Sequence, residues 1–396
     1  MDGRTSYVSD KDVYREIDKA ILRGGYGTLS EKEELRRQMF YSIRGFDVLE
    51  KYLGDSSISE IMVIGASRIF VEQNGKIRRI EEHFSEEGDV YRLIEQIVAP
   101  TNRMVNEACP IVDSRLPDGS RVHIVLPPVS LEGPVITIRK FLKGGMTIEK
   151  LLAFEEFPEK LTGILSALVK SRYNILISGA TNSGKSSLLN ALAEYIGKRE
   201  RVITIEDSAE LQLFHVENLV RLETRNANME GENEITMQDL IKASLRMRPD
   251  RIIVGEVRGA EAMSMLQALS TGHSGSVSSI HANSCRDALR RLETMVLMGM
   301  DMPLAAIQGL IASSVDILIH LGRLTTGKRK ILEICEIKDY SRAEYDIRTL
   351  FQYKAGQTES LEMTGKLFHT EKLKSYGQYE NYCEAVRLFC EEKREG

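Results

Sequence analysis

The sequence predicts an α/β protein in which a parallel sheet covered by helices follows a smaller α+β module and a helical N-terminal segment. Beyond residue 150, short apolar segments of strand length alternate with amphipathic helices, which is typical of a parallel sheet buried on both faces. Between residues 58 and 142, the apolar positions follow the period of strands around one helix. Before residue 58, they recur at helical spacing.

These changes of period also suggest where the domains begin and end. The chain has 396 residues, enough for two to three domains at roughly 150 residues each. We expect a helical N-terminal segment at residues 1–57, an α+β domain at 58–142 and a linker containing Lys143-Gly144-Gly145 at 143–149. The parallel-sheet domain should span residues 150–340, and a C-terminal extension should occupy 341–396.

Composition excludes several classes of protein. The net charge of −5, from 53 Lys+Arg and 58 Asp+Glu, argues against a nucleic-acid binder held by overall charge. Trp is absent and aromatic residues make up only 6%, so a base-stacking surface is not expected. The longest apolar run, Gly309–Leu321, is too short to span a bilayer and contains serines and an aspartate.

The N-terminus and the cysteines indicate the compartment. Residues 1–20 carry charges throughout and lack the apolar stretch of a signal peptide. The five cysteines are scattered and form no C-x-x-C pair, so we expect neither a disulfide framework nor a four-cysteine zinc site. These features favour a cytoplasmic protein.

The N-terminal half contains four predicted groups of elements. Val13, Ile17 and Ile21 mark one helix, and Ser30 with Glu33 forms a capping-box pattern for a second helix over 31–52. The segment 68–80 is a predicted hairpin that turns at Asn74-Gly75. A helix over 90–98 and two strands, Val122–Leu126 and Val135–Arg139, complete the α+β module. At the other end of the chain, an apolar stripe over 379–390 is expected to pack on the body, with a partner-binding helix as the alternative.

The most specific signal in the sequence is a glycine-rich loop. Residues 179–186 match G-x-x-x-x-G-K-[ST], between an apolar strand over 174–178 and an amphipathic helix. In that context, backbone N–H groups and the helix N-terminus face phosphates, Lys185 reaches the β- and γ-phosphates, and the Ser186 hydroxyl ligates Mg²⁺. We therefore predict that the chain binds a nucleoside triphosphate with Mg²⁺. The predicted binding residues are Gly179, Ala180, Thr181, Asn182, Ser183, Gly184, Lys185, Ser186 and Ser187.

Two acidic residues follow predicted strands and are candidates for catalysis. Glu206 ends the apolar segment 201–205, and Glu256 ends the segment 251–255. In an open α/β sheet the ligand lies beyond the carboxyl ends of the strands, so both acids should approach the nucleotide. The alternative is that each acid merely caps the next helix. We favour Glu206 for activating water and Glu256 for binding the metal, although these roles could be exchanged.

Two histidines flank another predicted strand. His273 precedes the small-residue segment 276–280 and His281 follows it. We interpret them as γ-phosphate sensors, whereas the alternative is two ordinary, hydrogen-bonded polar side chains. A metal site built on this pair is not expected, because no third ligand occurs at suitable spacing.

The sequence contains four blocks in the order GATNSGKSS, TIEDSAEL, RPDRIIVGEVRGAEA and STGHSGSVSSIHANS. They resemble the Walker A, Asp-box, Walker B and His-box motifs of the type II and type IV secretion ATPases, the GspE- and PilT-like motors. The run over 115–141 is similar to the N-domain edge of that family, especially of its CpaF branch, which drives tight-adherence (Flp) pili. The zinc-binding tetracysteine insertion of the GspE-like branch is absent. The resemblance covers residues 58–338.

This resemblance implies a RecA-like ATPase domain, a PAS-like N-domain and a cytoplasmic homohexamer that hydrolyses ATP. Nucleotides would lie between the two domains, and Arg121 and Arg139 match family arginines that reach the phosphates, although both could be ordinary surface charges. The implied partner is an inner-membrane platform protein of a pilus or secretion system. The motor would therefore lie at the cytoplasmic face of the membrane without a membrane segment of its own.

Two other functions remain open at this point. The first is a nucleic-acid translocase, or conjugation-type motor, on the same core, which the net charge of −5 disfavours. The second is a nucleotide-binding scaffold that hydrolyses ATP too slowly to act as a motor, which the presence of Lys185, Glu206 and Glu256 disfavours.

Overall fold

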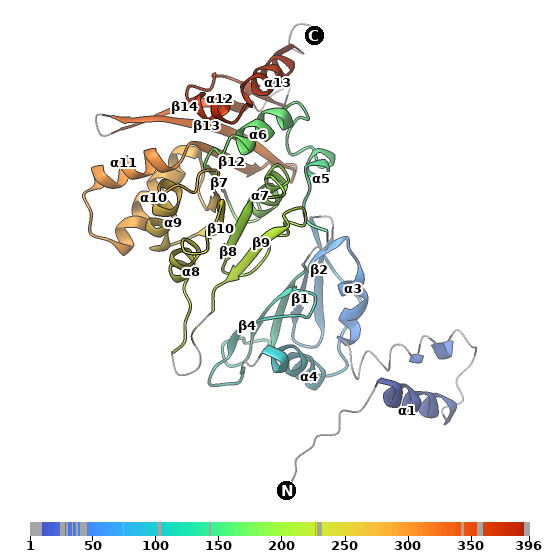
Figure 1. Ribbon diagram of the computed structural model, residues 1–396. Helices are drawn as coiled ribbons and strands as arrows, with labels where there is room; N and C mark the ends of the chain where they lie inside the picture. Colours follow the sequence, from blue (N-terminus) through green and yellow to red (C-terminus); the bar gives the residue numbers. More distant parts are fainter. Residues whose placement is uncertain are drawn as a thin grey trace. The chain divides into compact units, whose positions relative to one another are not determined.

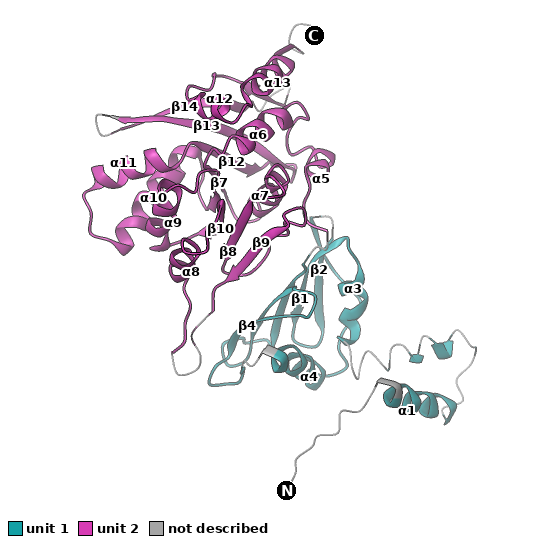
Figure 2. Cartoon of the chain, in the orientation of Figure 1, with its two compact units in different colours: residues 1–143 teal, residues 144–396 magenta. Residues whose placement is uncertain are grey.

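The computed structural model of this chain divides into two compact units, residues 1–143 and 144–396 (Figures 1 and 2). Each unit is described by itself. The residues that the structure describes are 10–23, 28, 31–33, 35, 36, 39, 46–73, 75–101, 104–141, 144–225, 227, 232–341, 344–354 and 359–391.

Unit 1 is built on a six-stranded antiparallel sheet whose order is β3-β2-β1-β6-β5-β4. The predicted hairpin is present as β2 and β3, and the predicted strand pair as β5 and β6, whereas sequence analysis missed β4. Asn74 of the predicted hairpin turn lies outside the described residues. The strands are β1 (Ile58–Ile64), β2 (Arg68–Gln73), β3 (Lys76–Arg79), β4 (Ile111–Arg115), β5 (Arg121–Val125) and β6 (Val135–Arg139).

One face of this sheet is covered by α4 (Glu87–Val98), which is the helix predicted over 90–98. Its apolar residues, including Leu93 and Ile97, pack with Ile61 and Val63 of β1 in a single buried cluster. Glu86 and Asp89 form a capping box at the helix start, which satisfies backbone N–H groups that have no partner inside the helix.

The N-terminal segment contains α1 (Asp10–Arg23), whose Val13, Ile17 and Ile21 are buried as predicted. The second predicted helix, over 31–52, is described only in part. Its end differs from the prediction, with a short 3₁₀ turn, η1 (Asp47–Leu49), and then α3 (Glu50–Gly54). The capping residue Ser30 lies outside the described residues. A second 3₁₀ turn of unit 1, η2 (Ala99–Thr101), follows α4.

Unit 2 is built on a nine-stranded sheet whose order is β15-β14-β13-β12-β7-β11-β10-β8-β9. The six strands from β12 to β9 are parallel, and the three at the other edge pair antiparallel. The strands are β7 (Ile175–Gly179), β8 (Arg201–Glu206), β9 (Asn218–Glu223), β10 (Arg251–Val257), β11 (Val277–Ile280), β12 (Ile317–Arg323), β13 (Arg329–Ser341), β14 (Glu344–Lys354) and β15 (Ser360–Met363).

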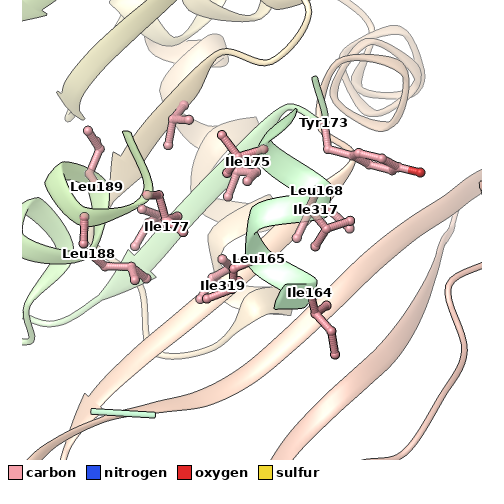
Figure 3. Close-up of a cluster of buried hydrophobic side chains, with 14 of the residues drawn as sticks. Ile164, Leu165, Leu168, Tyr173, Ile175, Ile177, Leu188, Leu189, Ile317 and Ile319 are labelled. Atoms are coloured by element: carbon pink, nitrogen blue, oxygen red, sulfur yellow. The ribbon is translucent and has the colours of Figure 1, made fainter. Parts of the chain in front are cut away.

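Helices cover both faces of the parallel part of this sheet. Along β7, Ile175 and Ile177 belong to one buried cluster and Leu176 belongs to the other, because successive side chains of a strand point to opposite faces. Figure 3 shows the first cluster, in which residues of α6 and α7 pack against β7 and β12. The helices are α5 (Ile148–Ala153), α6 (Leu161–Lys170), α7 (Lys185–Ala193), α8 (Met237–Ser244), α9 (Glu261–Ser270), α10 (Cys285–Gly299), α11 (Leu304–Ser314), α12 (Glu371–Ser375) and α13 (Tyr379–Glu391).

The C-terminal residues are part of unit 2 and do not form a separate extension after residue 340. Strand β13 runs across that boundary, and β14 and β15 continue the same sheet. Helix α13 packs on α6, with Tyr382 and Ala385 buried in the first cluster. The apolar stripe over 379–390 therefore packs on the body as predicted, apart from Tyr379, Cys383 and Cys390, which are exposed. Among the described residues, no helix has the length and apolar character needed to cross a membrane.

Candidate nucleotide site

The glycine-rich loop 179–186 connects β7 to α7, as the sequence predicts. Asn182 and Gly184 have positive φ values of 60° and 101°, which let the backbone turn back before the helix begins. Ser183 is buried and its hydroxyl has no hydrogen-bond partner among the described residues. The loop therefore places backbone amides and the N-terminus of a nine-residue helix at the carboxyl edge of the sheet, an arrangement that suits an anion.

Lys185 is the first residue of α7, and its side chain is buried. The ammonium group donates hydrogen bonds to the carbonyl oxygens of Gly179 at 3.1 Å and Ala180 at 3.0 Å. Burial lowers the pKa of Lys185, while the nearby Glu256 opposes this shift. The Lys185 side chain thus folds over its own loop. A bound phosphate would offer oxygens that could accept the hydrogen bonds that the two carbonyl oxygens now accept.

Glu256 and His281 lie beside Lys185. Glu256 Oε1 is 3.6 Å from Lys185 Nζ and 2.8 Å from His281 Nε2, and His281 Nδ1 is 3.2 Å from Lys185 Nζ. The other carboxylate oxygen of Glu256 accepts hydrogen bonds from Arg258 at 2.7 and 2.9 Å. Sequence analysis predicted Glu256 and His281 at this position but missed Arg258, an exposed cation two residues beyond Glu256.

The order of the strands explains why these three side chains meet. Strand β11 lies between β7, which leads into Lys185, and β10, which carries Glu256, and all three strands are parallel. His281 directly follows β11, so it enters between the lysine and the glutamate. Burial lowers the pKa of His281, Lys185 and Arg258 lower it further, and Glu256 opposes them. The neutral imidazole is therefore favoured near neutral pH.

Glu206 ends β8 and is almost completely buried, with 4% of its surface exposed. Oε1 accepts hydrogen bonds from the backbone N–H groups of Glu210 at 2.8 Å and Leu211 at 3.0 Å, whereas Oε2 has no partner among the described residues. Burial raises the pKa of Glu206 to about 7, and the two backbone hydrogen bonds only partly offset it. A carboxylate with this pKa and one open oxygen can accept a proton from water at neutral pH.

The donor set at this edge fits Mg²⁺, which prefers carboxylate and hydroxyl oxygens. Ser186 lies in the first turn of α7, where its hydroxyl would serve as one ligand. The available acidic oxygens are the carboxylate of Glu256 and Oε2 of Glu206. Glu206 Oε2 is buried and has no hydrogen-bond partner in the described part of the chain.

The second predicted histidine lies elsewhere. His273 precedes β11, so it is at the amino end of the strand, while Lys185 is at the carboxyl ends. Its Nδ1 lies 3.3 Å from the carbonyl oxygen of Ala268. The four residues of β11 separate the two histidines by roughly 13 Å, so His281 lies beside Lys185 and His273 does not. The role of His273 as a γ-phosphate sensor stays a prediction.

Arg121 and Arg139 are found on neighbouring strands of unit 1. They are directly opposite each other in the register of β5 and β6, and Glu60 of β1 lies opposite Arg139 on its other side. The pair is thus held on a rigid sheet, and its role toward a nucleotide stays a prediction.

Sequence analysis missed a buried acid next to the glycine-rich loop. Glu156 has 3% of its surface exposed, and its Oε2 has no partner among the described residues. A Cβ added at Gly184 would lie 3.5 Å from this oxygen. Burial raises the pKa of Glu156 to about 7, and Arg329 and Lys330 partly offset it. Arg329 also donates a hydrogen bond to the carbonyl oxygen of Asn182 at 2.9 Å. No motif marks Glu156 in the sequence.

Comparison with known proteins identifies the family. Residues 43–373 match the family of type II/IV secretion system proteins. The chain belongs to this family. A putative conjugal transfer protein of Mycobacterium tuberculosis is 33% identical over 302 residues, which cover 75% of this chain and 85% of the relative. The type IV secretion system protein PtlH of Bordetella pertussis is 30% identical over 312 residues, covering 72% and 92%.

Solved structures related to this secretion system protein confirm the fold. The pilus retraction motor PilT with bound ADP superimposes with a TM-score of 0.54 at 18% identity, covering 86% of this chain and 88% of that one. The ATPase DotB of Legionella pneumophila gives a TM-score of 0.52 at 21% identity, covering 71% and 77%. The predicted α/β fold with a RecA-like core is therefore confirmed.

Proposed function

We propose that this protein is an ATP hydrolase that powers a secretion system or a pilus. The observation that carries the proposal is the convergence of Lys185, His281 and Glu256 at the end of three parallel strands, directly beyond a glycine-rich loop. A lysine, a neutral imidazole and a carboxylate at this edge provide a phosphate ligand, a sensor and an acidic oxygen within reach of one triphosphate. The nucleotide is ATP, as the family membership favours.

The chemistry follows from the positions of these groups. Bound phosphate oxygens replace the two carbonyl oxygens that now accept hydrogen bonds from Lys185. Ser186 and Glu256 would hold Mg²⁺, which would neutralise phosphate charge. Glu206 orients the attacking water and accepts its proton, because its pKa of about 7 matches the pH at which it must work. His281 donates a hydrogen bond to the γ-phosphate. Because His281 also contacts Glu256, loss of the γ-phosphate changes the surroundings of Glu256 as well.

Hydrolysis becomes mechanical work if it changes how the two units close on the nucleotide. In this proposal Arg121 and Arg139 reach the phosphates from unit 1, so that release of the γ-phosphate weakens their contact. The working assembly is a cytoplasmic homohexamer that docks on an inner-membrane platform protein. Within the family we favour the CpaF-like branch and Flp pilus assembly, on the resemblance of residues 115–141.

A second candidate is a motor for conjugal transfer. It is favoured by the names of two relatives, the mycobacterial protein and the conjugal transfer protein TrbB of Rhizobium radiobacter, which is 32% identical over 297 residues. Direct translocation of DNA by this chain is disfavoured by its net charge of −5.

Steady-state ATP hydrolysis by the purified full-length chain tests the proposal. We expect turnover that depends on Mg²⁺ and is abolished in Lys185→Ala, together with loss of nucleotide binding. Single- and double-stranded DNA should leave the rate unchanged at physiological salt. A strong stimulation by DNA would instead favour the translocase, and absence of hydrolysis under all these conditions would favour a nucleotide-binding scaffold.

A further inference from the structure

A second cluster of reactive side chains lies where the start of α10 meets β13. The sulfur atoms of Cys285 and Cys335 and a carboxylate oxygen of Glu333 all lie within 4.8 Å of one another. Both cysteines are buried, with 1% of their surface exposed, and neither forms a disulfide. Glu333 is half-buried. Two thiols and a carboxyl group in one buried spot are the kind of donor set that binds a metal ion.

The fold brings these residues together from two elements, β13 and α10. Glu333 and Cys335 are two positions apart on β13 and pair with His320 and Leu318 of β12. Cys285 is the first residue of α10, and its backbone N–H donates to the Glu333 carboxylate at 3.3 Å. The N-terminus of a helix stabilises nearby anions, so it favours the carboxylate of Glu333 at this position.

We propose that Cys285, Cys335 and Glu333 bind one Zn²⁺, with water as a fourth ligand. Thiolates select zinc over Mg²⁺ and Ca²⁺, and the carboxylate favours zinc over Cu⁺, which prefers sulfur ligands. The two cysteines bind as thiolates, so each zinc ion releases two thiol protons to solvent. The divalent cation offsets the negative charge that the two thiolates and the carboxylate carry once the thiols are deprotonated in this buried site.

This position connects the metal to the nucleotide site. His320, directly opposite Glu333, has its Nδ1 3.0 Å from the hydroxyl of Ser178, the residue that precedes the glycine-rich loop. Cys285 lies four residues after His281, and the Ser284 side chain between them caps α10 by accepting from the Asp287 N–H at 3.0 Å. Zinc would therefore fix the start of α10 and the β12–β13 pair, which together support the loop and the histidine.

Co²⁺ titration of the metal-free, reduced full-length protein tests the site. Co²⁺ held tetrahedrally by thiolates absorbs strongly in the visible and near-ultraviolet, unlike hydrated Co²⁺. We expect one equivalent to produce this spectrum and one equivalent of Zn²⁺ to abolish it. Cys285→Ser and Cys335→Ser should weaken binding by at least about a hundredfold, and Glu333→Gln, which keeps both thiols, by at least about tenfold.

The matched control is Cys383→Ser, which removes an exposed cysteine of the same unit and should leave the titration unchanged. Circular dichroism of each variant checks that it is folded. The proposal is wrong if the wild type gives no thiolate spectrum. It is equally wrong if the spectrum survives in folded Cys285→Ser and Cys335→Ser. A Cys285–Cys335 disulfide that forms in air in the presence of Zn²⁺, detected by mass spectrometry, would also overturn it.

Discussion

The raised pKa of Glu206 makes a quantitative prediction about the pH dependence of hydrolysis. With a pKa of about 7, roughly 10% of this side chain is ionised at pH 6 and roughly 90% at pH 8. If its ionised form accepts the proton from water, kcat/KM rises about tenfold between these pH values. A glutamate with an ordinary pKa would change by only a few per cent over the same range, because it is already ionised at pH 6.

The assay is ATP hydrolysis from pH 5.5 to 8.5 with Mg²⁺ in excess, at constant ionic strength. Glu206→Gln should lose most of the activity, and its residual rate should lack the rise near pH 7. Glu210→Gln, which changes another acid of the same loop but keeps the backbone N–H that donates to Glu206, should keep the rise. A wild-type rate that is flat between pH 6 and 8, or a rise retained in Glu206→Gln, would refute the role of Glu206 as the proton acceptor.

Three further predictions concern residues around this site. Glu156 keeps its proton to about pH 7 in the folded state but loses it near its ordinary pKa in the unfolded chain. Between these two pKa values the unfolded chain binds fewer protons, so the stability of the fold decreases as pH rises. Glu156→Gln lacks that fall, so its free energy of unfolding relative to wild type should increase by about 2 to 3 kcal/mol from pH 5 to pH 8, measured by urea unfolding with circular dichroism. A difference independent of pH would contradict this. His281→Ala should lower kcat roughly tenfold or more while nucleotide affinity, measured by calorimetry, changes little; equal losses in both would mean a purely structural role. Arg121→Ala with Arg139→Ala should reduce hydrolysis without changing the fold of unit 1, and unchanged turnover would show that these arginines are surface charges.

The glycine-rich loop and the strands that lead to it could be predicted because their signals are local. The segment 174–178 has three consecutive apolar residues at its centre, as is typical of a strand buried on both faces, and the pattern from Gly179 to Ser186 follows it directly. Glu206 and Glu256 could be placed because each ends a similar apolar segment. The parallel direction of these strands then brings their ends to one edge.

The remaining features depend on pairings that a sequence does not display. The apolar run 309–321 hides a boundary, since it contains the end of α11 and most of β12. Sequence analysis grouped His273 with His281, although residues before and after a strand lie at its opposite ends. Glu156 resembles any loop acid until β13 covers it, and Cys285 meets Cys335 only through the fold.

The central claim is that this site binds ATP and cleaves it with the acids at the strand ends. The most direct test compares ATP binding and single-turnover hydrolysis in wild type and Glu256→Gln, with Lys185→Ala as the variant that should not bind. We expect Glu256→Gln to bind ATP within about threefold of wild type and to cleave it at least about a hundredfold more slowly. Equal cleavage by wild type and Glu256→Gln would contradict the claim.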